Sequence, residues 1–482
     1  MELHASADAR HPTAAAAAAL VRKASERWRR SILCVSAVSC AAVDAACLDI
    51  PTIRYEINPA DLHAEECETL NPLSHLPLSR FDGHVRLGGE IRQRYEYTHN
   101  PGFGAEPQDA HGVWLQRYAL HSDLQWGSHL RAFVELHSAL ESGRASGPSP
   151  VDEDELEFQN AFLEGRFSFG RDMDLHVRAG RQEIQLGSAR LVSVRDGPNV
   201  RRTFDGFRIS ARTRAWTIDA LAMRPRHDRE GAFDDSTHES QLLWGVYATR
   251  APIAARALGL DAYYLVREND EATFAQGAGA ERRQTLGVRL FGAKDGWHWN
   301  LESIFQYGRF DGRRLSAWSI ASVTGYTWSE LTWQPSVQLS TNIASGDRDG
   351  RDRKLGTFHP LYPRGNYFSQ DAILGPQNFY NAHLFLTLNP CRICSLTIDY
   401  DAFWRLSTDD GVYGSNGSLL RSADGSKERW VATALSLAAE WNVNRHLSIT
   451  AIYTHFSPRD FLEQTGPSKA VDFLELTARL RF

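Results

Sequence analysis

The residues best suited to chemistry in this chain are arginines, and they are concentrated between residues 179 and 208. The stretch reads AGRQEIQLGSARLVSVRDGPNVRRTFDGFR. It begins as a strand pattern, and Gly187, Gly197 and Pro198 then interrupt it, so the middle is predicted to be a shaped loop. Because guanidinium is planar and permanently charged, such a loop can bind carboxylates bidentately. The alternative is an extended surface loop in an arginine-rich proteome.

Composition narrows the class of protein that presents this loop. Of the 53 basic residues only five are lysine, so guanidinium supplies most of the positive charge. The net charge of -6 argues against nucleic acid as a partner. An acidic run, Asp347, Asp349 and Asp352, lacks the final glutamate and the spacing of a calcium hand, so a solvated loop is expected there. We predict neither a cofactor nor a metal site.

Hydropathy restricts the ways in which the chain could enter a membrane. The mean hydropathy is -0.40, and no run of 18 apolar residues exists, which excludes a helical membrane protein. A membrane β-barrel is still allowed, because its strands expose only every second residue to lipid.

The first 45 residues have the layout of a secretory signal peptide. Arginines and a lysine precede a short apolar segment at 31–43, and cleavage is predicted after Ala45 or Ala46. A lipoprotein cysteine at Cys40 or Cys47 is the weaker alternative. We therefore divide the chain into a signal peptide at 1–45, an N-terminal periplasmic segment at 46–80 and a barrel at 81–482.

From residue 81 onward the dominant signal is alternation with period two. In the segment 86–97, charged residues and glycine occupy one face, and apolar or aromatic residues occupy most of the other. The same pattern predicts strands at 86–97, 113–126, 129–139, 157–169, 174–185, 203–214, 216–223, 240–250, 258–267, 282–291, 297–307, 315–328, 331–345, 378–388, 395–407, 429–441, 446–456 and 470–482. The even total is what bacterial outer-membrane barrels require.

The connections between these segments alternate in length. With both termini in the periplasm, the connections on that side are short, whereas those outside, such as 186–202, 268–281 and 346–377, are long; 309–314 is the exception. The chain ends in an alternating segment whose last residue is Phe482, similar to the signal read by the barrel assembly machinery. The prediction is a closed, all-β, antiparallel transmembrane barrel of about 18 strands in the outer membrane.

Four segments resemble the alginate-export family of outer-membrane proteins. They are GRQEIQLGSARLVSVRDGPNVRRTFDG at 180–206, FHPLYPRGNYFSQDAILGPQNFYN at 358–381, DYDAFWRLSTDDGVY at 399–413 and YTHFSPRDFL at 453–462. The resemblance implies a monomeric barrel with an arginine-rich lumen through which an anionic polyuronate passes. The family's known exporter also has long segments that gate its pore, and no periplasmic turn predicted for this chain is long enough to act as such a plug.

The predicted function is therefore an outer-membrane channel for alginate or another polyuronate, with many weak, equivalent guanidinium sites. The alternative is an anion-selective porin for small acidic sugars or other organic anions. An enzyme is not expected, because no G-x-S-x-G context is present. Membrane lipid and periplasmic export proteins are further candidate partners.

The predicted pathway is formed by lumen-facing arginines and by arginines of an inward-folded loop. The candidates are Arg92, Arg94, Arg117, Arg131, Arg166, Arg178, Arg181, Arg190, Arg195, Arg201, Arg202, Arg208, Arg405 and Arg459. Acidic side chains are expected to hold some of them in position, namely Glu90, Glu135, Glu164, Asp196 and Asp205.

Overall fold

The computed structural model describes residues 52–56, 76–78, 82–170, 172–253, 257–365, 368 and 372–482. The predicted signal peptide and most of the predicted N-terminal segment lie outside the described residues. No helix within these ranges is long and apolar enough to cross a membrane.

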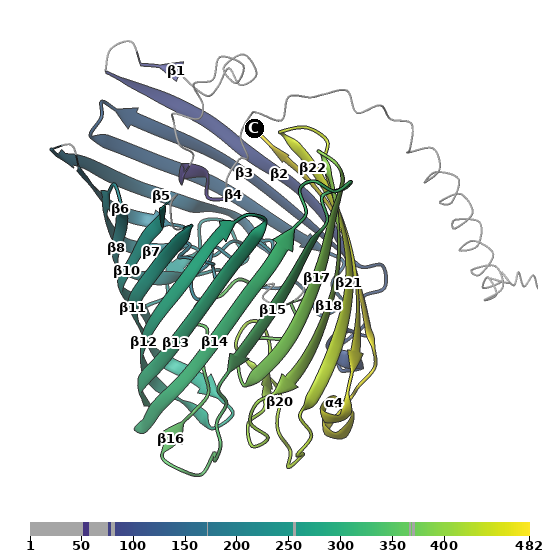
Figure 1. Ribbon diagram of the computed structural model, residues 1–482. Helices are drawn as coiled ribbons and strands as arrows, with labels where there is room; N and C mark the ends of the chain where they lie inside the picture. The colour runs from purple at the N-terminus through teal and green to yellow at the C-terminus, as the bar shows by residue number, and fades with distance from the viewer. Residues whose placement is uncertain are drawn as a thin grey trace, which may run out of the picture. The chain divides into compact units, whose positions relative to one another are not determined.

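The described chain forms a closed antiparallel β-barrel of 18 long strands (Figure 1). Each long strand pairs with its neighbours in the chain, and β2 pairs with β23 to close the ring. The strands are β2 Gly83–His99, β3 Val113–Trp126, β4 Leu130–Ser142, β5 Asp154–Phe169, β6 Met173–Gln182, β7 Phe204–Thr213, β8 Trp216–His227, β10 Gln241–Ile253, β11 Leu258–Phe274, β12 Gly277–Lys294, β13 Trp297–Phe310, β14 Arg313–Thr327, β15 Ser336–Ala344, β17 Phe379–Cys391, β18 Cys394–Arg405, β21 Trp430–Asn442, β22 Leu447–Pro458 and β23 Val471–Arg481. The predicted closed, antiparallel, all-β barrel of 18 strands is confirmed.

Several short strands and helical turns accompany the 18 long strands. The strands are β1 Leu76–Pro77, β9 Ser236–Thr237, β16 Lys354–Leu355, β19 Val412–Tyr413 and β20 Leu419–Arg421, and the helical turns are η2 Arg54–Glu56, α3 Pro101–Gly104 and α4 Asp460–Thr465. Of these, β16 runs parallel to the end of β14, and β19 and β20 form a separate hairpin.

The two faces of the wall differ as the alternation predicts. In β3, Trp114 and Leu120 are about half exposed, at 50% and 57%, whereas Arg117 on the other face is 1% exposed. The same division recurs around the ring, because successive side chains of a strand point to opposite faces. The apolar face is therefore the outer, lipid-facing surface of the barrel, and the charged face lines the interior.

The two ends of the barrel also differ. We call the end that carries Phe482 the turn end and the opposite end the loop end. At the turn end most connections are short, for example the two residues between β17 and β18. At the loop end the connections between β6 and β7, and between β15 and β17, are the long segments 183–203 and 345–378.

Two predicted connection lengths are wrong. The predicted long loop at 268–281 is a tight hairpin, because β11 and β12 continue to pair as far as Phe274 and Gly277. The predicted short turn at 329–330 is the longer segment 328–335, where Trp333 and Gln334 adopt positive φ and Pro335 cannot donate a ladder hydrogen bond.

The outer face yields a direct test of orientation in lipid. Leu437 is 46% exposed in the middle of β21. Leu437→Arg should therefore lower the free energy of unfolding by about 2–4 kcal/mol, the cost of a cation near the bilayer midplane. Urea titration in phospholipid vesicles measures this loss. Glu463→Arg, on an exposed side chain of α4, is the control and should cost little; equal losses would contradict the assignment of faces.

Candidate functional site: the arginine-lined interior

The segment 183–203, here called the inward loop, leaves the wall between β6 and β7 and enters the barrel. On one side it lies against Arg92 of β2 and Arg117 of β3, both fully buried. Arg92 donates to the carbonyl oxygens of Asp196 (3.0 Å) and Pro198 (3.2 Å). Arg117 donates to the carbonyl of Asn199 at 2.9 Å. Backbone carbonyls of the inward loop thus satisfy guanidinium groups of the wall.

The other end of the inward loop reaches the far wall. Arg190 donates to the carboxylate of Glu302 on β13 at 2.8 Å and to Asn342 on β15 at 3.0 Å. In the ring order β13 lies about halfway round from β2. Because contacts at both walls belong to one loop, the inward loop crosses the interior.

Asp196 is the main counter-charge in this crossing. Its carboxylate contacts Arg117 at 2.7 Å and Arg479 of β23 at 2.9 Å. Burial alone would raise the pKa of Asp196, but the guanidinium groups of Arg479 and Arg117 outweigh burial and hold this pKa well below its usual value. The stabilisation from the ionised form is therefore complete above the unfolded pKa of ~4. It decreases progressively as the pH falls from there toward the depressed folded pKa.

A short piece of chain preceding the barrel meets the inward loop inside the lumen. Arg54 forms an ion pair with Glu90 of β2 at 2.6 Å. The Tyr55 hydroxyl donates to the carbonyl of Glu183, and Arg201 donates to the carbonyl of Thr52 at 2.7 Å. Residues 52–56, which we call the luminal segment, are therefore attached both to the wall and to the inward loop.

The luminal segment also has apolar anchors. Ile53 and Tyr55 are buried in a cluster with Phe133, Phe162 and Val194. The ring of Tyr55 lies edge-on to Phe162, with centroids 4.9 Å apart. Sequence reasoning missed this segment because five residues outside the alternating region carry no periodic signal. Only its mixture of apolar and charged residues could have indicated burial.

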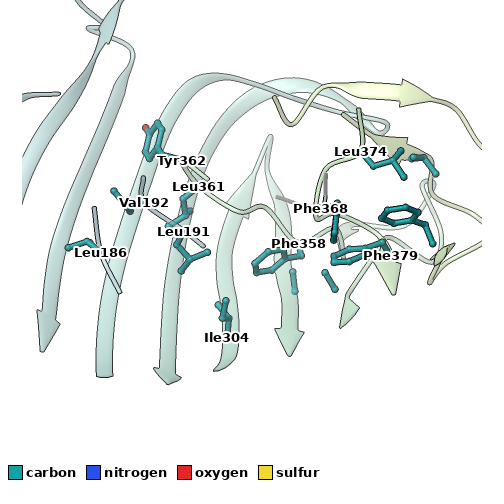
Figure 2. Packing of buried hydrophobic residues seen from close by; sticks show 14 of the residues in the cluster. Leu186, Leu191, Val192, Ile304, Phe358, Leu361, Tyr362, Phe368, Leu374 and Phe379 are labelled. Carbon is teal, nitrogen blue, oxygen red and sulfur yellow. The ribbon is translucent and has the colours of Figure 1, made fainter. Parts of the chain in front are cut away.

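The segment 345–378, called the second inward loop, packs on the first. Val192 and Tyr362 form a parallel bridge, in which Ser193 donates to the Tyr362 carbonyl at 3.0 Å and Tyr362 donates to the Leu191 carbonyl at 2.8 Å. Figure 2 shows part of the apolar cluster to which both loops contribute, with Leu186, Leu191 and Val192 from one and Phe358, Leu361, Tyr362, Phe368 and Leu374 from the other. The two loops therefore support each other inside the barrel.

Nearer the turn end, several predicted arginines share one carboxylate. Glu164 of β5 accepts from Arg166 at 2.8 Å and from Arg178 of β6 at 2.9 Å, and Arg131 lies 4.0 Å away. The guanidinium of Arg178 also lies over the ring of Tyr55, 4.4 Å from its centroid. Arg131 pairs mainly with Asp123, at 2.7 Å, and Asp123 also contacts Arg86. Two carboxylates therefore face four guanidinium groups, which leaves this part of the wall positively charged.

The remaining predicted residues of the inward loop and its neighbouring strands are held by specific partners. Arg94 contacts the Gly197 carbonyl (2.6 Å), Arg195 contacts Asp228 (3.6 Å), Arg201 contacts Glu183 (2.7 Å), Arg202 contacts the Pro363 carbonyl (2.9 Å), and Arg208 contacts Asp219 (2.9 Å). All are buried or half-buried. They fix the positions of the loop and the wall.

Four predicted residues, Arg181, Asp205, Arg405 and Arg459, lie apart from this crossing. Arg181 pairs with Asp205 at 2.9 Å across the β6–β7 ladder. Arg405 donates to backbone carbonyls of the loop 406–429, including Thr408 at 3.0 Å, and Arg459 lies over the ring of Trp430. Glu135 of β4 lies at the crossing itself. It is buried, accepts a hydrogen bond from Asn160 at 3.3 Å and interacts electrostatically with Arg201 and Arg54.

The interior is chemically asymmetric around the ring. Strand β23 and most strands from β2 to β12 direct arginines inward, although β10 does not, and we call this part of the ring the arginine arc. The strands from β15 to β22 form the polar arc, lined by the neutral side chains Gln338, Ser340, Asn342, Asn381, Thr387, Ser395, Thr397, Ser436, Thr450 and Thr454. Within the polar arc Asp399 and Asp401 both contact His383, at 2.7 and 3.1 Å. One side of the lumen can thus bind carboxylates, and the other can exchange hydrogen bonds with hydroxyl groups.

With this geometry established, comparison with known proteins defines the family. The chain matches the "Alginate export" family model over residues 84–474, which is most of its length. The chain belongs to the alginate-export family. No curated protein sequence matches it.

Solved structures of the same fold are outer-membrane channels. OccD3 of Pseudomonas aeruginosa is 12% identical, with a TM-score of 0.54 over 83% of this chain and 91% of that chain. OccAB2 of Acinetobacter baumannii is 10% identical, with a TM-score of 0.54 over 83% and 98%. P. aeruginosa OccK2, solved in complex with glucuronate, is 12% identical, with a TM-score of 0.53 over the same shares. Family and fold together identify an outer-membrane channel, a class typical of non-enzymes.

The counter-charge at Asp196 should control the charge inside the barrel. Asp196→Asn keeps the shape of the side chain but leaves Arg117 and Arg479 with less compensation, so the ratio of chloride to potassium permeability should rise. Reversal potentials in a salt gradient across a planar bilayer measure this ratio. Asp349→Asn, in the second inward loop on an exposed side chain, should leave it unchanged; no difference between the two variants would argue against a luminal role for Asp196.

The luminal segment should limit the width of the lumen. Replacing Arg54 and Tyr55 by alanine removes the ion pair with Glu90, the hydrogen bond to the Glu183 carbonyl and a buried ring, so single-channel conductance should increase. Glu56→Ala, whose side chain is 46% exposed, is the matched control in the same turn. A conductance equal to wild type in the double variant would mean that the segment does not occupy the conducting path.

Proposed function

We propose that this channel conducts polyuronate chains such as alginate, with the arginine arc binding carboxylates and the polar arc contacting sugar hydroxyls. The observation that carries the proposal is the division of one lumen into these two arcs. A uronate residue presents one carboxylate together with several hydroxyls, so it matches both arcs at once. A neutral sugar would leave the guanidinium groups unmatched, and a simple inorganic anion would not use the hydroxyl and amide groups.

Partial neutralisation of the luminal arginines favours transport, because it prevents the substrate from binding too tightly. Most guanidinium groups deep in the arginine arc already donate to the inward loop or to acidic side chains, so a passing carboxylate competes for them and does not gain a fully free cation. Conduction requires sites that attract the substrate and also release it. Arg166, Arg479 and Arg481 remain partly accessible, with side chains 25%, 17% and 18% exposed. Together with the exposed Arg212 of β7, they form the attractive surface toward the turn end.

In this proposal the turn end faces the periplasm and the loop end faces the exterior. The polymer enters past the accessible arginines and meets the crossing made by the inward loop and the luminal segment. Both are tied to the wall by hydrogen bonds, ion pairs and a small apolar cluster, and neither contributes a strand to the wall. Local displacement can therefore widen the path while the strand ladder stays intact.

The test is current block by a uronate oligomer in planar bilayers. Purified wild-type channel should prefer anions, and oligomannuronate added on the turn-end side should reduce the current. The triple variant Arg166→Gln, Arg479→Gln and Arg481→Gln should raise the blocking concentration roughly ten-fold or more, since a hydrogen bond to a charged group contributes about 1.5–3 kcal/mol. A cation-selective channel indifferent to the oligomer would overturn the proposal.

A second candidate is a porin for small acidic sugars. Its support is the crossing by the inward loop and the luminal segment, which narrows the lumen, and the glucuronate complex of OccK2, a protein of the same fold. Reversal potentials with glucuronate as the sole anion separate the two candidates. Free permeation of glucuronate without block by longer oligomers would favour the small-sugar porin, whereas block that strengthens with chain length would favour the polymer conduit.

A further inference from the structure

The outer face of the barrel carries a row of three arginines near the loop end. Arg282 of β12 lies opposite Arg309 of β13, and Arg309 lies opposite Arg314 of β14. All three are exposed, and they share the outward face with Leu286 and Phe305. The row thus belongs to the lipid-facing wall and is separate from the arginine arc inside the barrel.

The three positive charges of this row repel one another. Like charges directly opposite each other on paired strands destabilise a sheet. Glu268 of β11 contacts Arg282 at 3.3 Å, but both side chains are substantially exposed, so this pair contributes little. Within the described part of the chain, Arg309 and Arg314 form no ion pair. An external anion binding across the row would relieve the repulsion.

Next to the arginines, on the side away from the loop end, lies a row of side chains that can form hydrogen bonds. Gln284 lies opposite Tyr307, and Tyr307 lies opposite Ser316. From β11, the hydroxyl of Tyr264 donates to Gln284 at 2.7 Å. This row is two residues from the arginines along each strand, a separation of about 7 Å.

An apolar groove of about 830 Å³ continues from there toward the middle of the wall. Its upper lining is the cross-strand row of Leu286, Phe305 and Trp318. Its lower lining has Ser303 between Val288 and Ile320, again in one cross-strand row. The small side chain of Ser303 between two larger apolar residues keeps the groove hollow.

We propose that this surface is a binding site for a phosphorylated lipid of the membrane leaflet at the loop end. In order from the loop end it presents guanidinium groups, hydrogen-bonding side chains and an apolar groove. A phosphorylated glycolipid presents phosphate, sugar or ester oxygens and acyl chain in the same order and at comparable spacing. Guanidinium groups bind phosphate through paired charge-assisted hydrogen bonds, and burial of each acyl methylene contributes about 0.8 kcal/mol.

Native mass spectrometry of the purified full-length barrel tests the site, with lipid A as the probe. Wild type should retain bisphosphorylated lipid A at least ten-fold more tightly than its dephosphorylated form. The variant Arg282→Gln, Arg309→Gln and Arg314→Gln should lose this preference, and replacement of the same residues by lysine should keep part of it. The control Arg229→Gln, Arg348→Gln and Arg351→Gln removes the same charge from exposed loop residues and should behave as wild type.

The groove is tested separately by Ser303→Trp, which fills it without changing the charge and should weaken retention of both lipid forms. Heat-modified electrophoretic mobility checks that each variant is a folded barrel. Equal retention of the two lipid forms by wild type, or equal behaviour of the arginine and control triples, would overturn the proposal. So would displacement of the lipid by inorganic phosphate at matched concentration, which would indicate a free-phosphate site. Block by oligomannuronate should be unchanged in the outward triple, so failure of this site leaves the channel proposal standing.

Discussion

The interior of this barrel depends on the compensation of buried guanidinium groups by the inward loop. Arg92 and Arg117 are fully buried on adjacent strands, and a buried charge without partners is severely unfavourable. The carbonyls of residues 196–199 and the carboxylate of Asp196 supply those partners. The same contacts draw the loop across the lumen, so the stability of the wall and the shape of the passage have one physical origin.

The crossing is reinforced by apolar contact on its second side. Leu191 and Val192 pack on Leu361 and Tyr362 of the second inward loop, and backbone hydrogen bonds join the two loops in a short parallel bridge (Figure 2). Polar anchors at both walls and the apolar contacts between the two loops let a long segment keep one conformation inside a polar lumen. A loop held by charge alone would compete with water for every contact, whereas the buried apolar cluster excludes water from the contact between the two loops.

The wall uses arginine on both of its faces, with different consequences. Inside, Arg283 of β12 is fully buried and contacts Glu281 at 2.7 Å; one position earlier, Arg282 points outward above an apolar groove. The strand period of two separates these neighbours into different environments. One residue type can thus serve a luminal surface and a lipid-facing surface in the same strand.

The sequence by itself determined the strand segments, the two faces of the wall and the family. Those properties depend on alternation between neighbouring residues, which is readable along the chain. It did not determine the hairpin between β11 and β12 or the position of the luminal segment. Nor did it determine the partner of each arginine, since Arg190 and Glu302 are far apart in the sequence. Only closure of the barrel decided those pairs, because closure brings strands from opposite halves of the chain around one enclosed volume in which every buried charge must find a partner.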